Sequence, residues 1–157
     1  MTTVTRRYAF SASHRLHVRS LSESENARIF GKCNNPFGHG HNYTLSVSVC
    51  GDIDASTGVL VPIAALDDLV HRHVLHLLDH RNLNTDVPQF RDLVPTTENL
   101  AVLISGLLYD HRDELNCPAA RLHSVHVQET DRNSFEVLLP RGAPSSRLDS
   151  VEDLVHA

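Results

Sequence analysis

The segment His39-Gly40-His41-Asn42-Tyr43-Thr44-Leu45-Ser46-Val47-Ser48-Val49 decides how the chain folds. Every second residue from His39 to Val49 is apolar, aromatic or histidine, and the residues between them are small or polar. Strict alternation of this kind is typical of a β-strand that buries one face. The segment therefore predicts a strand that carries His39 and His41 on the same face as its apolar residues.

The segments on either side complete an α+β pattern. Residues 4–16 also alternate, with His14 on the face of Tyr8 and Phe10, and residues 17–38 are polar and predict a long loop. Apolar residues at helical spacing follow Pro62 as far as about Leu78, and a second helix is expected from an N-cap at Thr96 to about Leu115. Residues 121–129 and 135–139 predict a hairpin. The order β-β-α-α-β-β indicates a four-stranded antiparallel sheet with two helices on one face.

Length and composition favour one folded domain. The chain has 157 residues, 41% of them hydrophobic, and a formal charge of −5. We expect a single domain over residues 1–140 and a C-terminal tail over 141–157. Lys and Arg form no stripe, so nucleic acid is not an expected partner. The N-terminus has no apolar signal stretch and no long apolar run follows, so we expect no membrane contact and a cytoplasmic protein.

Three histidines predict a metal centre. His39 and His41 leave the same strand face about 6.6–7 Å apart along the strand, and the face that carries His14 can meet theirs across a strand pairing. Three neutral imidazoles suit Zn²⁺ better than Mg²⁺ or Ca²⁺, and three protein ligands leave a fourth position open for chemistry. The alternative is that they are hydrogen-bonded core histidines. His71, His73 and His76 have the spacing of solvated helix positions.

Several other residues are candidates for a role beside the metal. Cys33 precedes His39 on the loop, where a nearby Zn²⁺ would favour its thiolate, whereas Cys50 and Cys117 are expected to be structural. The odd cysteine count and the lack of CxxC spacing indicate a reducing compartment. Asp79 can fix the tautomer of His80 for proton transfer. Glu129 shares strand parity with Val127, so it either points inward to bind two adjacent N–H donors or belongs to a solvated turn.

Five motifs, in order along the chain, resemble the 6-pyruvoyltetrahydropterin synthase family, a group that includes the 6-carboxytetrahydropterin synthases of the queuosine pathway. They are Phe10-Ser11-Ala12-Ser13-His14-Arg15-Leu16, Cys33-Asn34-Asn35-Pro36-Phe37-Gly38-His39-Gly40-His41-Asn42-Tyr43, Leu78-Asp79-His80-Arg81-Asn82-Leu83-Asn84, Pro95-Thr96-Thr97-Glu98-Asn99 and Gln128-Glu129-Thr130-Asp131. The resemblance covers roughly residues 8 to 139. It implies the tunnelling fold (T-fold), a homohexamer built as a dimer of trimers, and sites at subunit interfaces.

The resemblance also implies a role for each matched residue. His14, His39 and His41 take the Zn²⁺ positions, and Cys33 takes that of the proton-abstracting thiolate. Asp79 and His80 take the place of the assisting pair, and Thr96, Thr97 and Glu129 that of the pterin anchor. The implied lyase reaction converts 7,8-dihydroneopterin triphosphate to 6-pyruvoyltetrahydropterin, a step of tetrahydrobiopterin biosynthesis, with loss of triphosphate and no external redox cofactor.

Three alternatives remain at this point. Five residues separate Cys33 from His39, which resembles the pyruvoyl type more than the carboxy type of the family. A non-catalytic pterin- or metal-binding protein is a second reading, and a zinc hydrolase a third, although no His-Glu-x-x-His segment occurs. Pro62 departs from the family pattern, in which an Asp or Asn is expected at that position, and residues 18–32 and the tail after Arg141 have no counterpart that the resemblance assigns.

Overall fold

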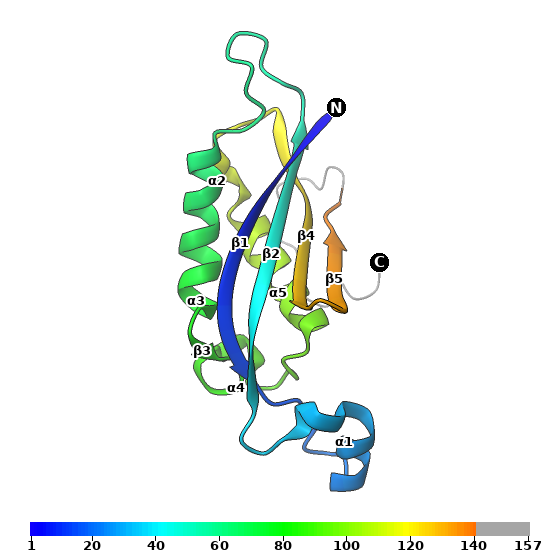
Figure 1. Ribbon diagram of the computed structural model, residues 1–157. Helices are drawn as coiled ribbons and strands as arrows, with labels where there is room; N and C mark the ends of the chain where they lie inside the picture. The colour runs from blue at the N-terminus through cyan, green and yellow to red at the C-terminus, as the bar shows by residue number, and fades with distance from the viewer. Residues whose placement is uncertain (141–157) are drawn as a thin grey trace.

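The computed structural model describes residues 1–140, so the predicted tail lies outside the described residues (Figure 1). Its strands are β1 (Thr2–His14), β2 (His39–Gly51), β3 (Arg81–Asn82), β4 (Ala120–Thr130) and β5 (Asn133–Leu138). Its α-helices are α1 (Glu23–Phe30), α2 (Ile63–Val70), α3 (His76–Leu78), α4 (Leu83–Asp86) and α5 (Thr97–Asp110). Short 3₁₀ turns follow α1, α4 and α5. No helix of the described part is long and apolar enough to cross a membrane.

The sheet has five strands in the order β3-β1-β2-β4-β5, with the main helices covering one face (Figure 1). The four long strands pair antiparallel, as the alternation predicts. The prediction of four strands was wrong by one, because β3 adds a two-residue parallel pairing at the edge of β1. His80 adopts a positive φ of 58° and its N–H donates to the Ser11 carbonyl at 2.6 Å, which turns the chain back onto that edge. A two-residue strand is too short to leave a periodic pattern in the sequence.

The predicted loop over residues 17–38 contains a helix. Ser22 caps α1 by accepting from the Glu25 N–H, and the Glu25 carboxylate accepts from the Ser22 N–H. This reciprocal capping box was readable in the sequence as Ser-x-x-Glu. The prediction failed because α1 has few apolar residues and so shows no clear periodicity; its one buried residue is Asn26.

The two long helices begin where the sequence predicts. Pro62 precedes α2, and the helical path continues through a π-helical segment, His71–Leu75, into α3, which ends at Leu78. Thr96 caps α5 by accepting from the Asn99 N–H. The second helix is shorter than expected, because the α-helix ends at Asp110 and a 3₁₀ turn, Arg112–Leu115, replaces its last turn.

The core lies between the sheet and these helices. The inward face of β2 is buried from Tyr43 to Val49, and each buried aliphatic side chain contributes about 1.5–3 kcal/mol relative to an exposed one. The fully buried side chains of this core include Leu45, Val47 and Val49 from β2 and Leu100, Ile104 and Leu108 from α5. The alternation that buries Leu45 and Val47 also directs His41 and His39 to the same side at the start of β2. The fold thus places the two histidines at one end of the core.

Candidate metal centre

Three imidazoles converge at the end of the sheet where β1 finishes and β2 begins. His14 pairs with His39 in the β1–β2 ladder, and His41 lies two residues further along β2. One ring nitrogen from each histidine lies within 4.8 Å of the other two. The rings are nearly perpendicular, with interplanar angles of 70°, 87° and 84°. Their in-plane lone pairs can therefore meet at one point, as the sequence predicted.

The nitrogen atoms show which ring positions face a metal. His14 Nδ1 lies 2.8 Å from the Pro95 carbonyl, which can only accept, so Nδ1 carries the proton and Nε2 presents its lone pair. His14 Nε2 lies 3.2 Å from His39 Nε2. Two ligand atoms of tetrahedral Zn²⁺, each bonded at about 2.0–2.1 Å, would lie about 3.3 Å apart, so the observed distance is close to that expected. His41 Nε2 is buried without a hydrogen-bond partner among the described residues. A metal ion would satisfy it.

The charge state of the trio also fits metal binding. Burial lowers the pKa of His14, and burial followed by the proximity of His41 lowers that of His39. Both rings are therefore neutral around pH 7, the form that coordinates a cation. An ordinary hydrogen-bonded core would leave His41 Nε2 buried and unpaired among the described residues, whereas an ion at the trio would satisfy it; the unpaired His39 nitrogen is Nδ1, on the side of the ring away from the Nε2 that faces His14.

Glu129 lies beside the trio and is held by two neutral donors. Its Oε1 is 3.7 Å from His14 Nε2 and 3.6 Å from His41 Nε2. Thr97 donates to Oε1 at 2.8 Å and Asn133 donates to Oε2 at 2.9 Å. Burial raises the pKa of Glu129, but the hydrogen bonds from Asn133 and Thr97 outweigh it, and the net pKa is lowered. The inward reading of Glu129 is the one that fits, because its side chain is only 12% exposed; the reading of a solvated turn carboxylate was wrong.

The remaining predicted residues differ in whether their side chains contact the centre. Thr97 reaches Glu129, whereas the Thr96 hydroxyl caps α5 instead. Cys33 is half-buried on the 3₁₀ turn Gly31–Asn34. Burial, and after it the charge of Glu129, raise the pKa of its thiol. The protein's own groups therefore oppose thiolate formation, and a dication at the histidines would act in the favourable direction.

Asp79 and His80 form a pair at the edge of the sheet. Asp79 Oδ1 lies 3.0 Å from His80 Nδ1 and accepts from the Ser11 N–H at 2.8 Å. That backbone hydrogen bond, more than His80, lowers the pKa of Asp79. The His80 side chain is 82% exposed, and no hydrogen bond or ion pair within residues 1–140 joins this pair to Cys33 or to the trio. His80 and His41 both line a hollow of about 390 Å³ on the surface.

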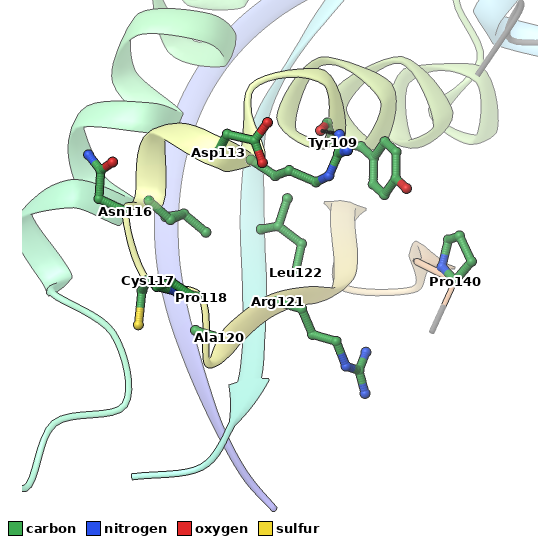
Figure 2. A pocket seen from close by; sticks show the side chains of 11 residues that line it. Tyr109, Asp113, Asn116, Cys117, Pro118, Ala120, Arg121, Leu122 and Pro140 are labelled. Carbon is green, nitrogen blue, oxygen red and sulfur yellow. Dashed lines mark hydrogen bonds between the residues drawn. The ribbon is translucent and has the colours of Figure 1, made fainter. Parts of the chain in front are cut away.

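A larger cavity lies at the opposite end of the sheet. It measures about 500 Å³ and is lined by residues from the end of α5 and the start of β4, among them Tyr109, Cys117 and Arg121 (Figure 2). Ala120 pairs with Gly51 and Gly51 with Thr2, whereas the trio lies where His14 pairs with His39. This cavity is therefore separate from the metal centre, although it is the larger of the two.

Two residues beside the centre were missed by sequence reasoning. Asn133 appeared only as a turn residue, yet its amide holds Glu129. Tyr43 appeared only as an apolar position, yet its buried hydroxyl has no hydrogen-bond partner among the described residues. Burial, then the charges of Glu129 and Cys33, raise the pKa of this phenol, so it remains protonated. Asn133 left no sequence signal beyond its place in the turn after Glu129, whereas Tyr43 shares strand parity with His41.

Comparisons with known proteins bear on the family and the fold of the chain. The family model for 6-pyruvoyl tetrahydropterin synthase matches residues 3–139. A human 6-pyruvoyl tetrahydrobiopterin synthase is 48% identical over 130 residues, which are 83% of this chain and 86% of that protein. A 6-carboxy-5,6,7,8-tetrahydropterin synthase of Bacillus subtilis is 32% identical over 137 residues, 85% and 88% of the two chains. The solved Caenorhabditis elegans 6-pyruvoyl tetrahydropterin synthase superposes with a TM-score of 0.80 at 38% identity, covering 88% of this chain and 96% of that one.

Proposed function

The chain belongs to the 6-pyruvoyl tetrahydropterin synthase family, and on that premise we propose that it converts 7,8-dihydroneopterin triphosphate to 6-pyruvoyltetrahydropterin with elimination of triphosphate. The observation that carries the proposal is the convergence of His14, His39 and His41 beside Glu129. The pyruvoyl product is preferred over the carboxy product because pyruvoyl synthases of human and of Dictyostelium discoideum are 48% and 40% identical to the chain, whereas a carboxy synthase of Bacillus subtilis is 32% identical.

The three histidines would hold Zn²⁺. When bound, the ion would polarise the hydroxyls of the substrate side chain and make the adjacent C–H more acidic. The Pro95 carbonyl keeps His14 in the tautomer that leaves Nε2 free for the ion. With Zn²⁺ bound, the trio would supply three of the four ligands of a tetrahedral site, which would leave the fourth position for substrate.

Glu129 would bind the pterin ring. Each carboxylate oxygen has about two lone-pair sites; Thr97 and Asn133 take one on each oxygen, which leaves one on each for a ligand. A ring edge with two adjacent N–H donors, such as the 2-amino-4-oxo edge of a pterin, fits these two sites. Thr96, which caps α5 next to Thr97, remains part of the proposed anchor through the resemblance alone.

Cys33 would remove the proton from the substrate side chain, and Asp79 with His80 would assist proton transfer. Asp79 accepts from two donors and stays ionised, so it can hold His80 in one tautomer. Because no hydrogen bond or ion pair joins the pair to the trio within the described residues, we propose, as the resemblance implies, that the active assembly is a hexamer with sites at subunit interfaces. Three free cysteines fit a reducing compartment, and we propose that the protein is cytoplasmic.

The test is direct. Zinc-loaded protein incubated with 7,8-dihydroneopterin triphosphate should release triphosphate and give a product with the mass of 6-pyruvoyltetrahydropterin. Release of acetaldehyde would instead identify the carboxy activity. Cys33→Ala is the control for a non-catalytic pterin-binding protein: if neither the wild type nor this variant turns over substrate, that reading replaces the enzyme.

A further inference from the structure

The chain has three tyrosines, and the hydroxyl of Tyr43 differs from that of Tyr8. Tyr8 donates to Asp67 Oδ1 at 2.9 Å. Tyr43 is 1% exposed, and its hydroxyl is buried without a hydrogen-bond partner among residues 1–140. Buried polar groups in native proteins nearly always have a partner, so an unpaired one requires a physical explanation.

The ring of Tyr43 is fixed in place. It stacks on Phe10 with centroids 5.0 Å apart and planes 13° from parallel, and it meets the ring of His41 edge-on at 5.6 Å. Contacts on both sides hold the ring, so the hydroxyl cannot turn towards another protein acceptor without breaking this packing.

Tyr43 lies on the face of β2 that carries two of the three histidines. Tyr43 follows His39 and His41 at intervals of two along β2, so the three side chains share one face of the sheet. Glu129 and Cys33 are the two ionisable groups whose charges act on the phenol. Thr44 pairs with Gln128 in the β2–β4 ladder, so Tyr43 and Glu129, the next residues along the two antiparallel strands, occupy neighbouring positions of the sheet.

The hydroxyl also supplies what Glu129 lacks. Glu129 offers two acceptor oxygens and can pair only with N–H or O–H groups of a ligand, whereas a neutral phenol can donate. A pterin edge contains both N–H donors and acceptor atoms, and a site built to pair both kinds discriminates against rings that lack either.

We propose that the Tyr43 hydroxyl donates a hydrogen bond to an acceptor atom of the bound ring next to Glu129, and is a further substrate-binding residue of this site. The inference rests on the proposed function for the class of ligand, a pterin. Without ligand the hydroxyl is unsatisfied, and binding gives it a partner. The residue thus trades stability of the free protein for affinity.

Tyr43→Phe tests this, because it removes one oxygen and keeps the shape of the ring. In ligand-free protein the melting temperature should stay the same or rise by about 2–4 °C, since an unsatisfied buried group is lost. Binding of biopterin to the zinc-loaded protein, followed by fluorescence, should weaken roughly tenfold. KM for dihydroneopterin triphosphate should rise by a similar factor with a smaller change in kcat.

Two matched variants separate a binding role from a structural one. Tyr8→Phe removes a paired hydroxyl and should lower the melting temperature while leaving biopterin affinity unchanged. Tyr109→Phe, at the cavity of the opposite end (Figure 2), should change neither. The inference is overturned if Tyr43→Phe binds biopterin as tightly as the wild type, or if it loses stability as Tyr8→Phe does.

Failure of the proposed function gives a different result. If the wild type binds biopterin in a Tyr43-dependent way but makes no product, the reaction assignment fails and the inference stands. If it makes product with a KM that is indifferent to Tyr43→Phe, the inference fails and the reaction assignment stands. A wild type that does not bind biopterin at all also overturns the inference.

Discussion

Two groups of side chains in the described part of the chain have the composition of a metal site, and they differ in the orientation of their rings. The first is the trio His14, His39 and His41 with Glu129 beside it. The second, at the π-helical segment and the turn after α5, consists of His73, His111 and Glu114. In both groups the ligand atoms lie within 4.8 Å of one another. Distance alone therefore does not separate them.

The rings of the second group are stacked. Those of His73 and His111 are 10° from parallel with centroids 3.6 Å apart. An imidazole nitrogen binds a metal in its ring plane, so one ion between parallel rings would lie out of both planes. Glu114 also accepts from Arg72 Nη2 at 2.7 Å, and His73 Nε2 lies 3.1 Å from its Oε1. The group is organised around the carboxylate, whereas the trio is organised around a point that a cation can occupy.

The largest effect is expected from removing one histidine of the first group, and the same change in the second group is its control. His41→Ala should reduce zinc affinity by more than the roughly 10–100-fold that follows from losing a group that only orients a ligand, and turnover should fall below detection. His73→Ala should retain wild-type zinc content. Isothermal titration with Zn²⁺ and metal analysis of the purified variants check both. If His73→Ala lost its zinc and His41→Ala kept it, the second group and not the first would be the metal site.

The next effect separates chemistry from metal binding within the first site. Cys33→Ala should lower kcat by about 10²–10⁴, the usual contribution of a positioned acid or base, while zinc affinity stays near that of the wild type. Cys117→Ala, at the cavity of the opposite end, is the matched control and should keep wild-type kcat. Equal losses in the two variants would show that the thiol of Cys33 has no special role.

Strand parity explains why much of the first site was predictable. The alternation along residues 39–49 and 4–16 placed His14, His39 and His41 on one face, and the β1–β2 register brought them together. Parity with Val127 likewise directed Glu129 inward. The capping box of α1 was present in the sequence as Ser22 and Glu25, but a helix with so few apolar residues gives periodicity nothing to detect.

The second group could not be read from the sequence. His73 has the spacing of a solvated helix position, and the expectation of solvation holds for His71 and His76 but was wrong for His73, which is half-buried against Glu114. Its partners lie about 40 residues away, on a 3₁₀ turn that replaced the predicted end of the second helix. Tertiary packing of the π-helical segment against that turn creates the contact. The same limit hid Asn133 and the hydroxyl of Tyr43.

A smaller effect is expected from dismantling the second group. Glu114→Gln removes the charge that faces Arg72, His73 and His111 while keeping the size of the side chain. Because the carboxylate is partly exposed, the melting temperature at pH 7 should fall by at most about 4 °C. Zinc affinity and kcat should not change. Differential scanning calorimetry of the zinc-loaded protein measures the shift, and a loss of bound zinc in this variant would assign the second group to the metal.

The smallest effect is the change with pH in the difference between the melting temperatures of the wild type and Glu114→Gln. Hydrogen bonding from His73, followed by the charges of Arg72 and the two histidines, lowers the pKa of Glu114 below its ordinary value of 4.5. A carboxyl whose pKa is lower in the folded than in the unfolded state contributes stability above the unfolded pKa, and this contribution is lost as pH falls through the folded pKa. The melting temperatures of the wild type and Glu114→Gln should therefore differ at pH 6–7 and converge below about pH 4. A difference that persists undiminished at pH 3 would mean that the carboxylate charge is not what holds the stacked rings, and that packing alone accounts for the second group.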